Sequence, residues 1–261
     1  LPRSALLAIA AGVPVLVLLV VVTFILARRS SDAGARAAEG GPGGESSVEA
    51  RATRAAPEKL RAAAAGGAAA LEALAAEFPE DPAVHAALAR ALGDAGRGAE
   101  MLRAVQTVLG LDASAVDDEL LDAVATAAQQ PETIDEAFAL LEGPLGARGV
   151  DALVALSTNK TAPASVQRRA AKSVARADVR AKAAPATAVM LDLKSAKKCE
   201  DKRRLLDRVK DDGDARVLPA LRAMKSPRGC GFMGMRDCFS CLRKSDALDE
   251  AIKAVEARSS K

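Results

Sequence analysis

One stretch near the start of the chain limits its fold more than any other. Residues 4–27 read SALLAIAAGVPVLVLLVVVTFILA and contain no charged side chain. A helix needs about 20 apolar residues to cross the hydrocarbon core of a bilayer, and this run of about 24 is long enough. It also exceeds the apolar part of a signal peptide, and Arg28 and Arg29 follow it in place of a small-residue cleavage site. We therefore expect a transmembrane helix within residues 1–29.

The sequence contains conflicting evidence on the orientation of this span in the membrane. Arg28, Arg29 and Arg36 follow the span and Arg3 precedes it, so the positive-inside rule places the rest of the chain in the cytoplasm. However, we expect further residues to precede Leu1, and their charges are not counted. The cysteines discussed below favour the opposite side, and we give them more weight. The expected localisation is a single-pass membrane protein with an extracytoplasmic C-terminal part.

Beyond the span, the side-chain composition favours helices throughout. The chain has neither Trp nor Tyr, and aromatic residues make up 2% of it. Ala has the highest helix propensity and contributes little apolar area, so such a core depends on close contact between helices. No segment shows the alternation typical of several strands. We expect an all-α fold, either an irregular α-solenoid or a helical bundle with a Cys-rich C-terminal loop.

Composition also divides the chain into regions. Residues 30–70 form a linker rich in Gly, Ala and Ser, of which residues 30–54 are expected to be flexible and the low-complexity residues 61–70 partly helical. Residues 71–145 are acidic, with fifteen carboxylates and three arginines between Leu71 and Glu142, whereas residues 146–261 are basic. We interpret the charge either as two solvated surfaces or as two lobes that attract each other or different partners. A nucleic-acid partner is not expected, because the basic region has few rings for stacking and no groove-binding motif.

Apolar residues recur at helical spacing from Leu71 onward, and turn signals such as FPEDP and QQPET separate the stripes. Two of these turns, at Asp81 and Asp112, lie about 31 residues apart, close to the period of about 34 in tetratricopeptide units. The segment DPAVHAALARALGDAGRGAEMLRAVQTVLGLD resembles one degenerate unit of that repeat. Further on, GDARVLPALRAM resembles the start of a HEAT-type helix. These resemblances imply stacked helical hairpins that bind a protein or peptide partner through exposed positions of residues 71–145.

The four cysteines allow three interpretations. They are Cys199, Cys230, Cys238 and Cys241. Four thiolates can bind zinc, but strong zinc motifs show two CxxC pairs and this chain has one, CFSC. The same CxxC lacks the strand and helix that flank it in thiol-redox centres. Two disulfides fit a domain held outside the cytoplasm, where they would stabilise a loop that buries little apolar surface. We favour the disulfides and, among the three possible pairings, Cys230–Cys238 with Cys199–Cys241.

No residue set in this chain predicts catalysis. His85 is the single histidine, and no nucleophile or base lies near it in the sequence. The carboxylates Asp117, Asp118, Glu119 and Asp122 have the spacing of a helix start, where acidic groups favour the helix dipole. They do not form the separated pair of an acid–base site. Protease, nucleotide-binding and nucleophile-elbow motifs are absent from the sequence. We expect neither an enzyme nor a bound cofactor.

The order of these parts resembles a known family. A span, a Gly/Ala tether, Ala-rich helices and the basic end AKKCEDKRRLLDRVKDDGDARVLPALRAMKSPRGCGFMGMRDCFSCLR occur in that order. This looks like the C-terminal region of certain bacterial membrane-spanning serine/threonine protein kinases, most of all at residues 199–209 and 230–243. In that family the catalytic domain precedes the span and the remainder is extracytoplasmic. The chain departs from the kinase pattern because it has no Gly-rich loop, VAIK-type lysine, HRD or DFG. The resemblance therefore implies the anchor and outer sensor region of a signal-transducing kinase, with no catalytic residue.

The preferred hypothesis is thus a membrane-anchored helical-repeat region that contacts the bilayer through residues 4–27 and binds a protein or peptide. The alternative is a cytoplasmic, zinc-stabilised adaptor tethered to the inner membrane face. That alternative would use Cys199, Cys230, Cys238 and Cys241 as zinc ligands.

Overall fold

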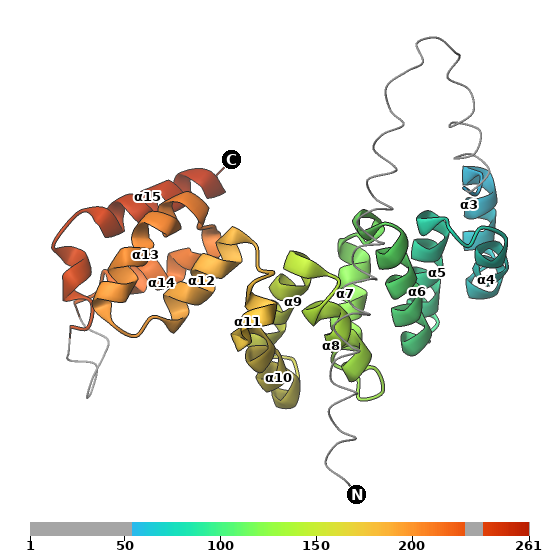
Figure 1. Cartoon of the computed structure of the whole chain (residues 1–261), viewed down its shortest axis with the longest axis horizontal. Helices are drawn as coiled ribbons and strands as arrows, with labels where there is room; N and C mark the ends of the chain where they lie inside the picture. The colour runs from blue at the N-terminus through green and yellow to red at the C-terminus, as the bar shows by residue number, and fades with distance from the viewer. Residues whose placement is uncertain (1–53, 228–236, 261) are drawn as a thin grey trace, which may run out of the picture. The chain divides into compact units, whose positions relative to one another are not determined.

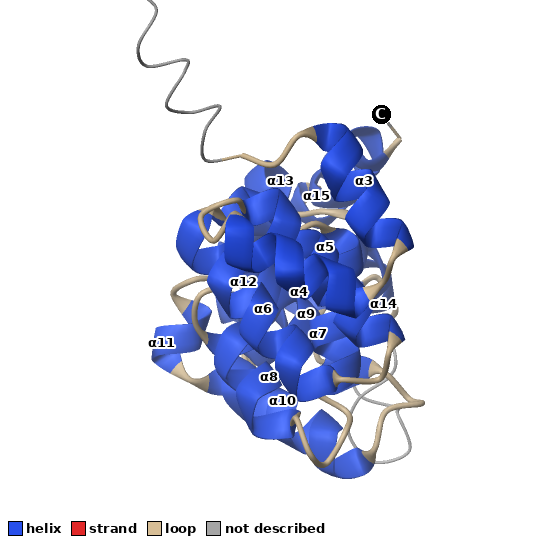
Figure 2. Cartoon of the chain, turned by 90° about the vertical axis from the view of Figure 1, so that its right-hand side faces the viewer, coloured by secondary structure: helices blue, strands red, loops and turns tan. Residues whose placement is uncertain are grey.

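The computed structural model describes residues 54–227 and 237–260, and every segment of regular structure in these residues is helical (Figures 1 and 2). This confirms the all-α prediction for the described part of the chain. These residues belong to one compact unit, Arg51–Lys261, and a separate unit, Leu1–Ala50, lies outside them. The acidic and basic regions are therefore parts of the same unit. Its helices are α3 Pro57–Ala65, α4 Ala68–Glu77, α5 Pro82–Asp94, α6 Gly98–Leu111, η2 Ala113–Ala115, α7 Asp118–Ala127, α8 Ile134–Glu142, α9 Gly146–Thr158, α10 Ala164–Ala175, α11 Ala177–Arg180, α12 Pro185–Ser195, α13 Cys199–Asp212, η3 Ala215–Val217, α14 Leu218–Met224, η5 Ser240–Arg243 and α15 Ala247–Ser259.

The membrane span and the linker predicted for the N-terminal part have different outcomes. The expected span falls outside the described residues and stays a prediction, and none of the described helices is long and apolar enough to cross a bilayer. The expected linker, residues 30–70, is helical at its C-terminal end, where the sequence predicts partial helix at residues 61–70. There α3 begins at Pro57 and α4 at Ala68, so helical structure starts before Leu71. The cause is the high helix propensity of Ala, which outweighs the low complexity of this segment.

Local signals in the sequence explain where several helices begin. The Asp81 carboxylate accepts a hydrogen bond from the Ala83 backbone N–H at 2.9 Å, and Pro82 is the first residue of α5. The Asp117 carboxylate caps α7 in the same way by accepting from the Leu120 N–H at 3.0 Å. Such caps satisfy backbone donors that have no partner inside the helix. Because Asp118 and Glu119 follow in the first turn of α7, the predicted helix-start role of these acidic residues is confirmed.

The predicted apolar stripes form the core. It consists mainly of Leu, Val and Ala, and Phe138 is the largest fully buried side chain. Buried stripe members include Val84, Leu88, Leu92, Leu102, Val105, Leu120, Val124, Phe138, Leu141, Val150, Leu153, Val166, Ala170, Val174, Leu206, Val209, Leu221, Leu248, Ile252 and Val255.

The helices pack as a series of hairpins. Consecutive helices contact each other from α3 to α11. Alternate helices also touch: α3 with α5, α5 with α7, α7 with α9, and α6 with α8. Near the C-terminus, α13 packs against α12 and α15, and η5 contacts both α13 and α15. Figure 1 shows the paired arrangement of α5 and α6, which carry one wall of the site described next.

Candidate functional site

A groove of about 810 Å³ opens among the end of α5, the start of α6, α7 and the turn that follows α7. Met101, Leu120 and Ala127 line it but are almost fully buried, so its accessible apolar surface comes from residues such as the half-buried Ala123. Ala99 and Thr126 line it as exposed residues. The volume is within the range of known small-ligand and peptide-side-chain sites. It lies inside the region, residues 71–145, that the sequence predicts as the partner-binding surface.

Glycines leave one side of this groove without bulky side chains. Gly93, Gly96 and Gly98 all line it at the α5–α6 turn. Gly96 has φ +72°, a left-handed conformation that side chains with a Cβ rarely adopt. A Cβ added at Gly98 would lie 3.3 Å from Cγ2 of Thr133, so glycine permits close approach of α6 to the turn after α7. The α5–α6 turn therefore adds little side-chain bulk to the groove.

The three arginines of the acidic region all line this groove. Arg90 of α5 pairs with Asp117 and, at 2.9 Å, with Glu119 of α7. These ion pairs connect α5 to α7 across the groove wall. Because Arg90 and its partners come from segments almost thirty residues apart, their proximity is not visible in the sequence.

Arg97 forms the second charged cluster of the groove. Its guanidinium pairs with Glu72 of α4 at 2.7 Å and with Glu100 of α6 at 2.5 Å. Hydrogen bonds to Glu100 and then Glu72 raise the pKa of Arg97, and the hydrogen bond from Arg97 lowers the pKa of Glu100. Both groups therefore stay ionised near neutral pH, and the charge of this cluster is fixed.

Three further charged side chains line the groove without a carboxylate–guanidinium pair. In the described part of the chain, the carboxylates of Asp94 and Glu132 have neither a hydrogen bond nor an ion pair. Arg103 donates from Nε to the Ala99 carbonyl oxygen at 3.4 Å, and its charge helps to lower the pKa of Glu100. Asp94, Arg103 and Glu132 are all exposed, so they are available to a ligand.

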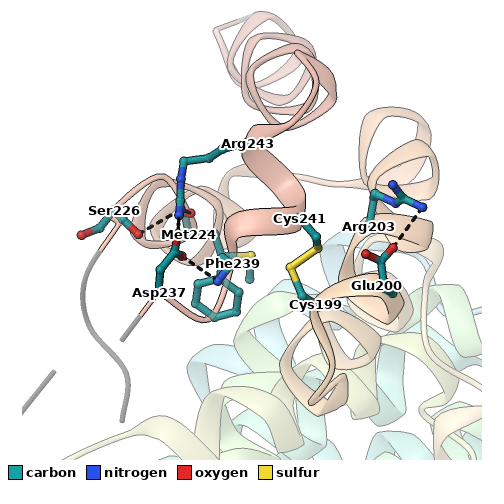
Figure 3. The surroundings of a disulfide bond; sticks show 9 residues. All are labelled: Cys199, Glu200, Arg203, Met224, Ser226, Asp237, Phe239, Cys241 and Arg243. Carbon is teal, nitrogen blue, oxygen red and sulfur yellow. Dashed lines mark hydrogen bonds and ion pairs between the residues drawn. A yellow bond between two sulfur atoms is a disulfide. The ribbon is translucent and has the colours of Figure 1, made fainter. Parts of the chain in front are cut away.

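The second candidate feature is the disulfide between Cys199 and Cys241 (Figure 3). It joins the first residue of α13 to η5, with 6.1 Å between the two Cα atoms and a sequence separation of 42. This confirms one of the two predicted pairings. Cys230 lies outside the described residues, so the pairing Cys230–Cys238 stays a prediction.

The Cys199–Cys241 disulfide also bears on the other two interpretations of the cysteines, the CxxC redox centre and the zinc site. Cys241 is joined to Cys199 and not to Cys238, so the CxxC cysteines do not form a disulfide with each other. A sulfur atom in a disulfide is also not the thiolate that zinc requires. Within the described ranges, no three or more His, Cys, Asp or Glu side chains are grouped to hold a metal ion. The zinc alternative would therefore require a different, reduced state of Cys199 and Cys241.

A buried lysine lies beside this disulfide. Lys202, one turn after Cys199, is 7% exposed, and its Nζ donates to the Leu193 carbonyl oxygen at 2.6 Å. Its Nζ also lies 5.9 Å from the centroid of the Phe239 ring. Burial lowers the pKa of Lys202, because loss of water disfavours the charged amine. Sequence analysis missed this residue, since the surrounding KKCEDKRR is typical of a solvated surface.

Further contacts hold the segment Asp237–Arg243 in place. Arg243 donates to the carbonyl oxygens of Met224 and Ser226, each at 3.2 Å, and pairs with Asp237 (Figure 3). Together with the disulfide, these bonds attach η5 to α13 and to the end of α14.

His85 lies in a hollow next to the main groove, and Glu100 and Arg103 line both. Its Nε2 lies 2.9 Å from the Pro79 carbonyl oxygen, within hydrogen-bonding distance. It lines a smaller hollow of about 350 Å³ together with Glu72, Glu100 and Arg103. The cysteines and His85 therefore belong to different parts of the fold, as their separation in the sequence suggests.

Comparisons of the chain with protein-family models, with curated proteins and with solved structures gave no match.

Proposed function

We propose that this chain is a membrane-anchored helical-repeat region that binds a protein or peptide in the groove among α5, α6 and α7. The groove itself carries the proposal. It combines apolar surface from Ala99 and Ala123 with charged side chains that include Asp94 and Glu132. Apolar surface with a few placed polar groups is the usual composition of a binding site.

The packing of the helices supports the finer assignment to an irregular, tetratricopeptide-like α-solenoid. In a solenoid each helix contacts its hairpin partner and the equivalent helix of the next hairpin. Contacts of α5 with both α6 and α7, and of α6 with α8, follow that pattern. Such stacks of hairpins usually bind their partners on extended concave surfaces.

Membrane anchorage and the link to transmembrane serine/threonine kinases remain parts of this proposal. The apolar run at residues 4–27 supports the anchor. The bond between Cys199 and Cys241 supports an extracytoplasmic position, because disulfides persist in oxidising compartments. In this proposal the region senses or recruits a partner for signal transduction and performs no catalytic step itself.

Peptide selection on the purified full chain in lipid nanodiscs tests the groove. A random peptide library displayed on phage would be selected on the wild-type chain, and each binder would be measured again on two variants. Ala99→Trp places a bulky side chain at the groove, whereas Ala171→Trp makes the same change at an exposed position of α10 that does not line it. Circular dichroism and thermal unfolding would establish that both variants fold.

We expect binders whose affinity falls at least about tenfold with Ala99→Trp and changes less than about twofold with Ala171→Trp. The proposed groove would be rejected if selection gave no binder, or if all binders were equally sensitive to both substitutions.

A further inference from the structure

We propose that the groove accepts a lysine or arginine side chain from an extended polypeptide. This inference rests on the proposed function and names the chemistry of its partner. The observation behind it is the imbalance between carboxylates that are free at the groove and guanidiniums that are already paired.

The charges that line and surround the groove favour a cation. Two of its three arginines, Arg90 and Arg97, are each paired with two carboxylates. Among the lining residues, the four carboxylates of Asp94, Glu100, Glu119 and Glu132 outnumber the three guanidiniums, and those of Asp94 and Glu132 are unpaired in the described residues. An incoming cationic side chain reduces this excess, whereas an incoming anion increases it.

An anionic ligand would also have to compete for the arginines. To bind Arg97, it would displace Glu72 or Glu100, and the freed carboxylate would remain nearby as a repulsive charge. Arg103 is the groove arginine without an ion pair, and its field already acts on Glu100. By contrast, Asp94 and Glu132 can bind a cation without breaking any contact in the described residues.

The shape of the groove fits a long cationic side chain. Lys and Arg bury an apolar stem and keep a charged end group in water. Ala99 and Ala123 provide apolar surface for the stem, and the carboxylates of Asp94 and Glu132 are exposed at the same groove. The volume of about 810 Å³ also leaves room for part of the peptide backbone.

The charge of the surrounding region adds a longer-range attraction. Between Leu71 and Glu142 the sequence has fifteen acidic and three basic residues. A surface of one sign accelerates the approach of an oppositely charged partner, and salt weakens this effect. Binding of a basic segment should therefore weaken as the ionic strength rises.

Charge-reversed variants and labelled peptides test the inference on the full chain in nanodiscs. The probes are two fluorescein-labelled peptides of equal length, one alternating Ala and Lys and the other alternating Ala and Glu. Glu132→Lys reverses a groove charge. Glu136→Lys makes the same change in net charge at an exposed, unpaired residue of α8 that does not line the groove. Fluorescence anisotropy gives the dissociation constants.

We expect the Lys peptide to bind at least about tenfold more tightly than the Glu peptide. Glu132→Lys should weaken it about fivefold or more, and Glu136→Lys less than about twofold. Tighter binding of the Glu peptide, or equal loss in the two variants, would overturn the inference. This test can fail while the proposed groove survives. If the peptide selection gave acidic binders whose binding is lost with Ala99→Trp, the groove would remain a binding site but its partner would not be cationic.

Discussion

At the scale of single residues, Asp117 connects the start of a helix with the wall of the groove. Its carboxylate accepts from the Leu120 N–H at 3.0 Å and also pairs with Arg90. The backbone hydrogen bond from Leu120 is the largest contribution that lowers the pKa of Asp117, and Arg90 adds to it. The residue therefore stabilises α7 locally and fixes α5 against it.

We predict that Asp117→Ala lowers the free energy of unfolding by about 1–2 kcal/mol, since an N-cap aspartate typically contributes about 1 kcal/mol. Asp122→Ala is the matched control, because Asp122 is exposed on the same helix and has no hydrogen bond or ion pair in the described residues. It should change stability by less than about 0.5 kcal/mol. Urea unfolding of both variants measures the difference, and equal effects would contradict the capping role.

The pH dependence of this difference follows from the direction of the pKa shift. Because the pKa of Asp117 is lower in the folded state than its ordinary value of 3.8, the folded state prefers the ionised group. Its stabilising contribution is full above that ordinary value and is lost as the pH falls through the lower folded-state pKa. The gap in stability between wild type and Asp117→Ala should thus be constant near neutral pH and narrow below about pH 4.

At the scale of elements, the contact between α8 and α9 depends on a glycine. Gly149 is buried in α9, and a Cβ added there would overlap the Leu141 carbonyl oxygen and lie 2.9 Å from Cβ of Leu145. Backbone atoms cannot move away as a flexible side chain can. The close packing of small residues that the composition predicts is therefore realised here at one specific position.

We predict that Gly149→Ala destabilises the unit by at least about 2 kcal/mol, because overfilling a packed interface forces the backbone apart. Gly110→Ala in α6 is the control, since a Cβ there meets no atom within 4 Å. That change should be neutral or stabilise by up to about 1 kcal/mol through the higher helix propensity of Ala. Thermal unfolding of the two variants distinguishes them, and a shift of the same sign in both would refute the close contact.

The same interface illustrates which features of the elements sequence can reveal. The stripe that contains Val150 and Leu153 predicts a helix and its buried face, and both residues are buried. Periodicity cannot show which neighbour a helix meets, so it gave no reason to single out Gly149. It likewise could not reveal that Arg90 and Arg97 pair with carboxylates of other helices at one groove. The low-complexity sequence predicts partial helix at residues 61–70 but does not reveal that α3 starts at Pro57.

At the scale of the whole described unit, ion pairs connect the acidic and basic regions. Asp135 pairs with Arg169 at 2.5 Å, and Asp118 pairs with Arg148 at 2.8 Å. Arg169 also lies over the Phe138 ring, 4.3 Å from its centroid. Each such exposed pair contributes little by itself, typically below 1 kcal/mol. They nevertheless show that part of the charge asymmetry is neutralised within the unit. This agrees with the interpretation of the acidic and basic regions as two lobes that attract each other.

The disulfide gives the last prediction, which concerns the whole protein and its compartment. Digestion with trypsin releases Cys199–Lys202 as one peptide and places Cys238 and Cys241 together in Asp237–Arg243. Chymotrypsin then cleaves after Phe239 and separates these two cysteines. Mass spectrometry of protein alkylated directly in cells should find the Cys199 peptide linked to the Cys241 peptide, since the two are bonded in the structure.

This linkage also decides between the two sides of the membrane. Glutathione keeps cytosolic thiols reduced, so a disulfide in freshly alkylated protein places the basic region in an oxidising compartment. Removal of the bond with Cys199→Ala and Cys241→Ala together should lower the free energy of unfolding by about 2–4 kcal/mol, because it closes a long loop. Four alkylated thiols with about one bound zinc per chain would instead favour the cytoplasmic adaptor. Four alkylated thiols without zinc would exclude both the oxidising location and zinc as a structural ligand of Cys199 and Cys241.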